Sequence, residues 1–265
     1  MLELKNIYKT FNAGTINEKR ALNNLNLHLN PGEFVTVIGG NGAGKSTMLN
    51  CTAGVYSVEE GQILIDGIDV THLPEYKRAQ YIGRVFQDPM MGTAANMQIA
   101  ENLALAAHRG QSRGLRPMMT KQEKEEFRQQ LELLDLGLEN RMTSKVGLLS
   151  GGQRQALTLL MATLRKPKLL LLDEHTAALD PKTAAKVLET TQRIVEKDNL
   201  TTLMITHNMR DAIAYGNRLI MMYDGKIVVD VSGEEKKNLT VEQLLNLFSQ
   251  ASGSDEADDK LLLSK

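Results

Sequence analysis

The sequence predicts an α/β fold with a parallel sheet at its core, an antiparallel β subdomain at the N-terminus and a helical subdomain. Leu25, Leu27 and Leu29 alternate with polar residues, which is typical of a half-buried antiparallel strand. Short, continuously apolar runs later in the chain are typical of parallel strands that are covered on both faces. Between these runs, residues 88–165 follow helical periodicity and predict the helical subdomain.

The composition of the 265 residues is that of an ordinary globular protein. Hydrophobic residues make up 42% and charged residues 24%, which excludes wholesale disorder and fibrous structure. The formal net charge of −1 argues against a protein that wraps nucleic acid, and we expect no nucleic-acid partner. We expect a single domain over residues 1–250 and a disordered acidic tail over residues 251–265.

Cysteine content and hydropathy limit the cellular setting. The single cysteine, Cys51, excludes an intrachain disulfide framework, and we expect it to have an inert packing role. No apolar run approaches the ~18–20 residues that span a bilayer. The first residues also lack the apolar core of a secretory signal. The sequence therefore predicts an intracellular chain that reaches a membrane only through a partner.

Strands and hairpins can be placed from apolar runs and turn residues. Parallel strands are predicted at residues 34–39, 168–174 and 201–207, where the runs are short and continuous. Two hairpins are predicted at residues 63–70 and 219–231, because each has Asp-Gly between apolar runs.

Helix starts are marked by capping residues. Thr120 with Glu123 forms the pattern of a capping box, and an apolar stripe follows it. Asp180 stands before Pro181, which is the pattern of an N-cap followed by proline at the first helical position. We therefore expect one helix to begin at about residue 121 and another at about residue 181.

Residues 39–46 fit the pattern of a phosphate-binding loop, directly after a predicted strand and before a predicted helix. Glycines let successive backbone N–H groups face phosphate oxygens, and the following helix points its positive end at the same anion. Lys45 would supply a cation for the β- and γ-phosphates, and the Ser46 hydroxyl can bind Mg²⁺. The alternative is a glycine-rich turn that only caps a helix. The pattern and its context favour a P-loop NTPase core that binds ATP with Mg²⁺.

Two further predicted strands end in polar residues. Asp173 and Glu174 follow four leucines, and His207 follows the run at 201–206. Ligands of open parallel sheets bind beyond the carboxyl ends of the strands, so these groups should converge on the loop. We expect Asp173 to hold Mg²⁺, Glu174 to act as the base on the attacking water, and His207 to sense the γ-phosphate. The alternatives are loop residues, a helix cap and an ordinary polar residue.

The segment LSGGQ, with Ser150 and Gln153, precedes an apolar helical stripe. A capping box explains Ser150 and Gln153 in purely structural terms. Gly151 and Gly152 would weaken such a helix, but they would let the phosphate of another molecule approach its end closely. The glycines therefore indicate a second half of a nucleotide site.

These motifs, in this order, resemble the ATP-binding subunits of ABC transporters over residues 2–245. The resemblance implies that Phe11 stacks on adenine and that the Walker A loop comprises Gly39, Gly40, Asn41, Gly42, Ala43, Gly44, Lys45, Ser46 and Thr47. It implies that Gln87 contacts Mg²⁺ and reports to the membrane subunit, and that His207 is the switch histidine. It also implies that Ser150, Gly151, Gly152 and Gln153 complete the ATP site of a second subunit, and that Asp180 lies in the loop connecting the two sites. For Phe11, Gln87 and Asp180, the alternatives are a core aromatic, a surface residue and a helix N-cap.

Two positions depart from the family pattern. Gly40 stands where proline is common in the loop, which should soften the loop without removing a phosphate donor. His175 stands where proline usually follows the base, and it adds a titratable group. Either His175 perturbs the pH optimum or it has no effect; we expect a mild effect.

The resemblance also implies partners. We expect a homodimer that sandwiches two ATP molecules, with a different ATP-binding subunit as the alternative second chain. We expect integral membrane permease subunits, a peripheral location on the cytoplasmic face of the membrane and, for an importer, an extracytoplasmic substrate-binding protein. The combination of the segments DEHTAALD, PMMGTAAN and ITHNM resembles the branch of tryptophan/tyrosine uptake systems, which implies a small solute such as an amino acid. The alternative functions are a soluble, non-transport ABC ATPase and an unrelated phosphate-loop kinase.

Two segments have open interpretations. Met90, Met91 and Met97 suit either an adaptable groove for a helix of the membrane subunit or filling of the helical core. The loop with Arg109, Arg113 and Arg116 is interpreted either as a solvated basic loop or as a contact for acidic groups.

Overall fold

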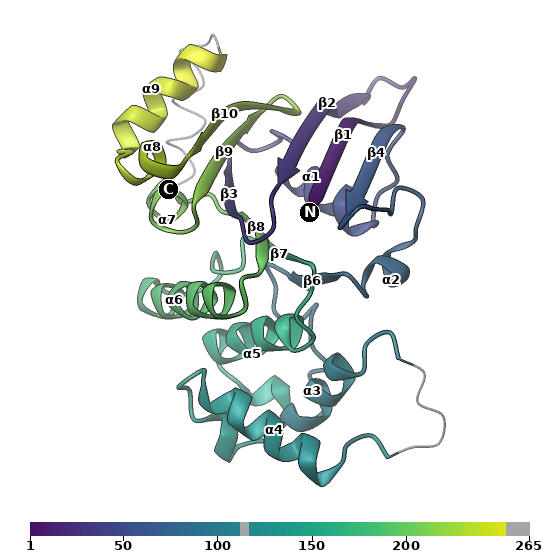
Figure 1. Cartoon of the computed structure of the whole chain (residues 1–265), viewed down its shortest axis with the longest axis vertical. Helices are drawn as coiled ribbons and strands as arrows, with labels where there is room; N and C mark the ends of the chain where they lie inside the picture. Colours follow the sequence, from purple (N-terminus) through teal and green to yellow (C-terminus); the bar gives the residue numbers. More distant parts are fainter. Residues whose placement is uncertain (112–116, 253–265) are drawn as a thin grey trace.

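Two sheets organise residues 1–111 and 117–252, which the computed structural model describes (Figure 1). The antiparallel sheet has the order β2-β1-β4-β5, formed by β1 (Leu2–Phe11), β2 (Lys19–Leu29), β4 (Glu60–Ile65) and β5 (Ile68–Asp69). The larger sheet has the order β10-β9-β3-β8-β7-β6, formed by β3 (Phe34–Ile38), β6 (Ile82–Val85), β7 (Leu169–Asp173), β8 (Thr201–Ile205), β9 (Arg218–Tyr223) and β10 (Lys226–Ser232). Its strands are parallel except for β10, which pairs antiparallel with β9 at the edge.

The predicted strands and hairpins are confirmed. The parallel strands predicted at 34–39, 168–174 and 201–207 are β3, β7 and β8. Both Asp-Gly pairs turn with positive φ, at 55° and 77° for Asp66 and Gly67, so that β4 pairs with β5 and β9 with β10. Strand β6 was not predicted from the sequence, because Gly83 and Arg84 interrupt its apolar run.

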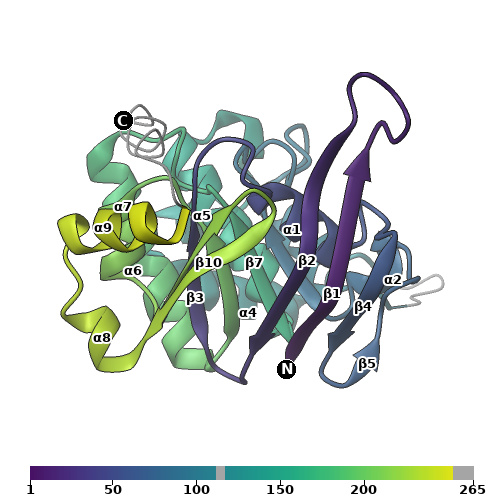
Figure 2. The same cartoon turned by 90° about the horizontal axis from the view of Figure 1, so that it is seen from above.

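The main core lies between the two sheets, where it encloses helix α1 (Lys45–Ala53) (Figure 2). Met48 and Leu49 of this helix are fully buried in that core. Cys51 is also buried, and burial raises the pKa of its thiol to about 11, so its predicted packing role is confirmed. Arg78, at the end of α2 (Glu75–Arg78), donates from Nη1 to the Cys51 and Thr52 carbonyls at 2.8 and 3.0 Å and so caps the helix.

The helical subdomain has a core of its own, at the end of the molecule away from the antiparallel sheet (Figure 1). It is built from helices α3 (Ile99–Ala107), α4 (Lys121–Glu132) and α5 (Gly151–Thr163), with short 3₁₀ turns η1 (Leu138–Asn140) and η2 (Val146–Leu148). The capping box predicted for α4 forms: Glu123 N–H donates to Thr120 Oγ1 at 3.1 Å, and Thr120 N–H donates to the Glu123 carboxylate at 2.6 Å.

The other face of the large sheet packs on α5 and on α6 (Pro181–Asp198). The edge at β9 and β10 is covered by α7 (Met209–Ala214), α8 (Gly233–Lys237) and α9 (Val241–Ser252). Helix α9 continues to Ser252, beyond the predicted start of the tail at residue 251, and residues 253–265 lie outside the described residues. Among the helices of the described ranges, none has the length and apolar character to cross a bilayer.

The closest approach of α5 to α6 depends on Gly152. A Cβ added at Gly152 would lie 2.1 Å from Cγ2 of Thr183, in the first turn of α6. A Cβ at Gly151 would meet only Leu179 Cδ2, at 3.3 Å. Gly152 therefore has a packing role within this chain, which the sequence analysis did not foresee.

His175, the residue after Glu174, is buried against α6. The His175 side chain is 2% exposed, and its Nε2 lies 3.1 Å from Thr191 Oγ1. Burial lowers the pKa of His175 to about 4, so the imidazole is neutral near pH 7. Of the outcomes considered for this departure from proline, the structure favours the one with no effect on the pH optimum.

We expect Gly152→Ala to destabilise the chain by about 1–3 kcal/mol, because the added methyl group collides with Thr183. In an unobstructed helix the same change would be stabilising. The double variant Gly152→Ala/Thr183→Ser, which lacks Cγ2, should recover most of the loss. Urea unfolding followed by circular dichroism measures both; a Gly152→Ala chain as stable as the wild type would contradict the packing role.

We expect acid to reduce the free energy of unfolding partly through His175. The unfolded imidazole binds its proton near pH 6.5 and the folded one near pH 4, so this stability is present above pH 6.5 and is lost as the pH falls toward 4. Between pH 7 and 5, the wild type should therefore lose about 2 kcal/mol more than His175→Gln in urea unfolding. Parallel losses in the two chains would show that the imidazole is not buried as described.

Candidate functional site

Three polar segments meet at the carboxyl edge of the large sheet, as the sequence predicted. Strands β3, β8 and β7 are neighbours, and the glycine-rich loop, His207 and Glu174 follow them in turn. Nδ1 of His207 lies 3.5 Å from Oε2 of Glu174. Lys45, at the start of α1, has its pKa lowered by burial, and it is near enough to Glu174 and Asp173 for both carboxylates to oppose that shift.

A pocket of about 270 Å³ lies at this edge. It is lined by Phe11, Lys19, Ala21, Asn41, Gly42, Ala43, Gly44, Lys45, Ser46, Thr47 and Glu174. The lining thus brings together the loop, the candidate base and the aromatic residue at the end of β1. Lys19 was missed by the sequence analysis, because its place in β2 has no motif around it.

The loop directs the N-terminus of α1 toward this pocket. Its N-cap, Gly44, has φ 101° and makes no side-chain capping bond, so the first N–H groups of α1 remain available to an anion. A Cβ at Gly44 would lie 2.5 Å from the Ala21 carbonyl oxygen, and one at Gly39 would lie 2.3 Å from that of Met222. At Gly40 a Cβ would meet no atom within 4 Å, so the surrounding atoms leave room for a side chain at this position.

The side chain of Lys45 is held over the loop by backbone carbonyl groups of the loop. Its side chain is buried, and Nζ donates to the carbonyl oxygens of Gly39 and Gly40 at 2.7 and 3.2 Å. Burial lowers the pKa of Lys45, while Glu174 and Asp173 oppose the shift. The arrangement places a desolvated cation beside the uncapped helix end, where a phosphate group would be attracted by both.

The two carboxylates at the end of β7 differ in surroundings. Glu174 has φ 44°, a left-handed conformation that is costly for a residue with a side chain and is concentrated at functional sites. The Asp173 carboxylate lies 3.6 Å from Nη2 of Arg84. Burial raises the pKa of Asp173, and Arg84 opposes the shift. Glu174 thus presents its carboxylate to the pocket from a strained backbone, whereas the carboxylate of Asp173 is paired with a cation.

Phe11 lies at the rim of the pocket and is not a core residue. Its ring meets that of Tyr56 edge-on, with centroids 5.3 Å apart, and Lys9 Nζ lies 5.5 Å from its centroid. One face of an aromatic ring at such a rim can stack on a planar base.

The other predicted residues lie outside the pocket lining. Gln87 is exposed, two residues beyond the end of β6. Asp180 caps α6 by accepting from Thr183 N–H at 3.1 Å, so its structural alternative is confirmed. The capping box of α5 also forms, with Gln153 N–H donating to Ser150 Oγ at 3.3 Å. Ser150 and Gly151 are exposed beside the first turn of α6, where a second molecule could reach them.

Comparison with known proteins agrees with this geometry. A family model described as "ABC transporter" matches residues 22–177. The tyrosine transport ATP-binding protein of Clostridioides difficile is 47% identical, over 95% of this chain and all of that protein. The spermidine/putrescine import protein PotA of Haemophilus influenzae is 36% identical over 89% of this chain, which spans 59% of PotA. The methionine import protein MetN of Bartonella henselae is 34% identical over 86% of this chain and 64% of MetN.

Solved structures have the same fold. The dimeric cassette MJ0796 in a post-hydrolysis state, bound to ADP and Pi, has a TM-score of 0.73 and 31% identity over 88% of this chain and 98% of that one. The ADP form of MJ1267 has a TM-score of 0.77 and 28% identity over 94% of this chain and 98% of that one. Both the fold class and the resemblance stated from the motifs are confirmed. The chain belongs to the ABC transporter family, as one of its ATP-binding, ATP-hydrolysing subunits.

Proposed function

We propose that this chain hydrolyses Mg²⁺-ATP in the pocket at the carboxyl edge of the large sheet and thereby drives an amino-acid importer. The observation that carries the proposal is the convergence of Lys45, Glu174 and His207 on the uncapped end of α1. The triphosphate would lie against the N–H groups of that helix end. Phe11 would stack on the base, and Lys19 would add a second cation over the loop.

The residues at hand fit Mg²⁺. Ser46 hydroxyl, Asp173 carboxylate and Gln87 amide are all hard oxygen donors, which this ion prefers. Within the described residues, no cluster of three His, Cys, Asp or Glu forms a complete metal site. Mg²⁺ would therefore be held partly by the phosphate oxygens, and when bound it would neutralise their charge.

Glu174 is the proposed general base. Its carboxylate would accept the proton of the water that attacks the γ-phosphate, while Lys45 would stay on the phosphates. His207, 3.5 Å from Glu174, would contact the γ-phosphate and orient the carboxylate. General-base catalysis of this kind contributes about 10²–10⁴-fold to the rate.

The second half of each site would come from another copy of the chain. Ser150 and Gly151 are exposed at the N-terminus of α5, outside the pocket that the same chain forms. A helix end of this kind can bind the γ-phosphate held by a second subunit. The dimeric structure of the related cassette MJ0796 supports this arrangement. We therefore propose a homodimer with two ATP molecules at its interface. Gly152, Gln153 and the Asp180 loop would belong to that interface.

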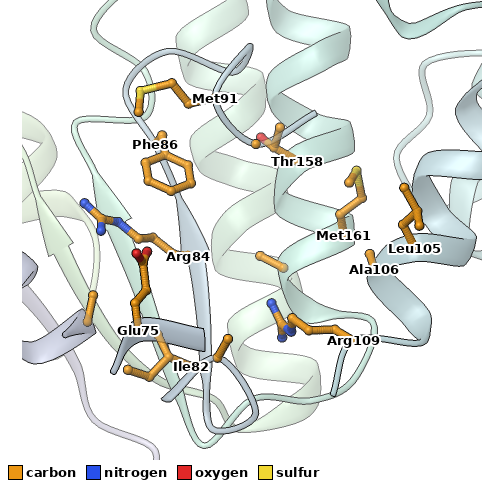
Figure 3. Close-up of a pocket in the computed structure, with 14 residues that line it drawn as sticks. Glu75, Ile82, Arg84, Phe86, Met91, Leu105, Ala106, Arg109, Thr158 and Met161 are labelled. Carbon is orange, nitrogen blue, oxygen red and sulfur yellow. The ribbon is translucent and has the colours of Figure 1, made fainter. Parts of the chain in front are cut away.

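A groove of about 380 Å³ is the proposed contact for the permease (Figure 3). It lies between the end of β6 and helices α3 and α5, and its lining is mostly apolar. Met91 on its rim is 70% exposed, which favours the groove interpretation over core filling for this methionine, whereas Met90 and Met97 are not among the residues that line the groove. Leu105 of α3, also on the rim, is 52% exposed. Arg109 also lines the groove, whereas Arg113 and Arg116 lie outside the described residues. This contact would hold the chain on the cytoplasmic face of the membrane.

The proposed solute is tyrosine or a related aromatic amino acid. This proposal is supported by the relative at 47% identity, a tyrosine transport ATP-binding protein, because the match covers all of that protein and 95% of this chain. An importer would also use an extracytoplasmic substrate-binding protein. The alternative of a soluble, non-transport ABC ATPase leaves the exposed apolar groove without an occupant.

We expect Glu174→Gln to bind ATP at least as well as the wild type, to hydrolyse it at least 100-fold more slowly, and to accumulate as an ATP-bound dimer. The amide keeps the size of the side chain but cannot accept a proton. Steady-state ATPase assays and size-exclusion chromatography measure the two effects. Lys45→Ala is the matched control, because it should lose tight ATP binding and so form no dimer. Rapid turnover by Glu174→Gln would place the base elsewhere.

We expect Leu105→Asp to abolish co-purification with the co-expressed permease, because docking would remove water from the new carboxylate in a mostly apolar groove. Ile68→Asp, which changes an exposed apolar residue of β5 to the same charge, is the control and should still co-purify. Circular dichroism checks that both variants fold. Equal recovery of the permease with the two variants would argue against this groove as the contact.

A further inference from the structure

Arg84 lines the groove and also contacts Asp173, the carboxylate expected to hold Mg²⁺. It lies on β6 and lines the groove, where Figure 3 shows its guanidinium between Phe86 and Glu75. Its Nη2 donates to Asn50 Oδ1 at 2.7 Å and lies 3.6 Å from Asp173 Oδ2. The side chains of Arg84 and Asp173 are only 12% and 17% exposed. Over the described ranges, this is the one ion pair that Asp173 makes.

Packing on Phe86 and a hydrogen bond to Asn50 hold the guanidinium close to Asp173. It stacks on the Phe86 ring at 4.5 Å from the centroid. Glu75 lines the groove beside it, but in the described residues no Glu75 oxygen forms an ion pair with it. Nε is buried without a hydrogen-bond partner, a cost that is unusual for a side chain with a packing role alone.

The contacts of Arg84 join two parts of the site. Asn50 is on α1, the helix that begins with Lys45, and Asp173 is the last residue of β7. A planar, charged guanidinium fixes the distance between such partners better than a flexible ammonium does. A shift of Arg84 or Phe86 in the groove wall would therefore move the Asp173 carboxylate relative to the phosphate loop.

We propose that Arg84 is a positioning residue: it orients the Asp173 carboxylate for Mg²⁺, and its place in the groove wall makes that orientation depend on what occupies the groove. The proposal rests on the proposed function, in which Asp173 holds Mg²⁺. It adds a physical connection between the groove and the hydrolytic site, made by one side chain.

The first test uses Arg84→Met, which keeps the length of the side chain and its packing on Phe86, and Arg84→Lys, which keeps the charge. The affinity of each variant for a fluorescent ATP analogue is measured once with Mg²⁺ and once with a chelator. The kcat of ATP hydrolysis is measured at saturating Mg²⁺-ATP. We expect Arg84→Met to lower kcat about tenfold and to weaken binding only when Mg²⁺ is present, because a small misplacement of a catalytic group is costly. Arg84→Lys should lie between Arg84→Met and the wild type.

The control is Arg128→Met, the same change on the exposed surface of α4, which should match the wild type in every measurement. Wild-type kcat and Mg²⁺-dependent binding in Arg84→Met would overturn the proposal. So would an equal loss of affinity with and without Mg²⁺, because a structural defect would weaken both.

The second test places a bulky maleimide in the groove at Met91→Cys. Cys51 is buried with its pKa raised to about 11, so the new thiol reacts selectively near neutral pH. We expect the label to change kcat at least twofold when Arg84 is present and to have no effect in the Arg84→Met background. An equal effect in both backgrounds, or none in either, would overturn the coupling.

Asp173→Asn separates this inference from the proposed function. If hydrolysis is lost in Asp173→Asn but intact in Arg84→Met, the positioning role of Arg84 is wrong and the Mg²⁺ assignment stands. If Asp173→Asn hydrolyses ATP normally, the Mg²⁺ assignment is wrong and the proposal for Arg84 is overturned with it.

Discussion

Helix α1 is buried between the two sheets, and this burial determines where its open N-terminus, and with it the pocket, must lie. An N-terminus without a capping side chain leaves backbone N–H groups unpaired, which a stable helix avoids unless a ligand completes them. The fully buried Met48 and Leu49 fix the helix in the core, and Arg78 satisfies carbonyl groups at its other end. All capping is therefore at the C-terminal end, and the open end faces the pocket.

The order of the strands then determines which side chains share that pocket. Because β3, β8 and β7 are adjacent and parallel, the residues that follow them emerge side by side, although they are distant in sequence. The strained backbone of Glu174 is stabilised by its hydrogen bond to the Ile205 carbonyl at 3.1 Å. Close packing of the sheet thus holds a costly conformation where the carboxylate is needed.

Two largely buried cations join neighbouring elements of the fold through hydrogen bonds and an ion pair. Lys236, 2% exposed, donates to the carbonyl oxygens of Ile213, Tyr215 and Gly216 at 2.9, 2.6 and 3.0 Å, and so completes the end of α7. Arg84 makes comparable contacts between β6, α1 and β7, with the difference that one of its partners is the carboxylate of Asp173, a candidate site residue. Such contacts are directional, so they transmit displacement in a way that apolar packing does not.

Sequence patterns were sufficient for the elements whose signals are local: the loop at 39–46, the Asp-Gly hairpins, the helix caps at Thr120 and Asp180, and the two acids at the end of β7. Each of these depends on residues within a few positions of one another, where backbone geometry and spacing suffice. Three contacts could be seen only in the folded chain: Gly152 makes room for Thr183, His175 is buried against α6, and Arg84 reaches Asp173. These contacts join residues far apart in the chain, and which side chain faces which depends on packing across the sheet, a property that no local pattern contains.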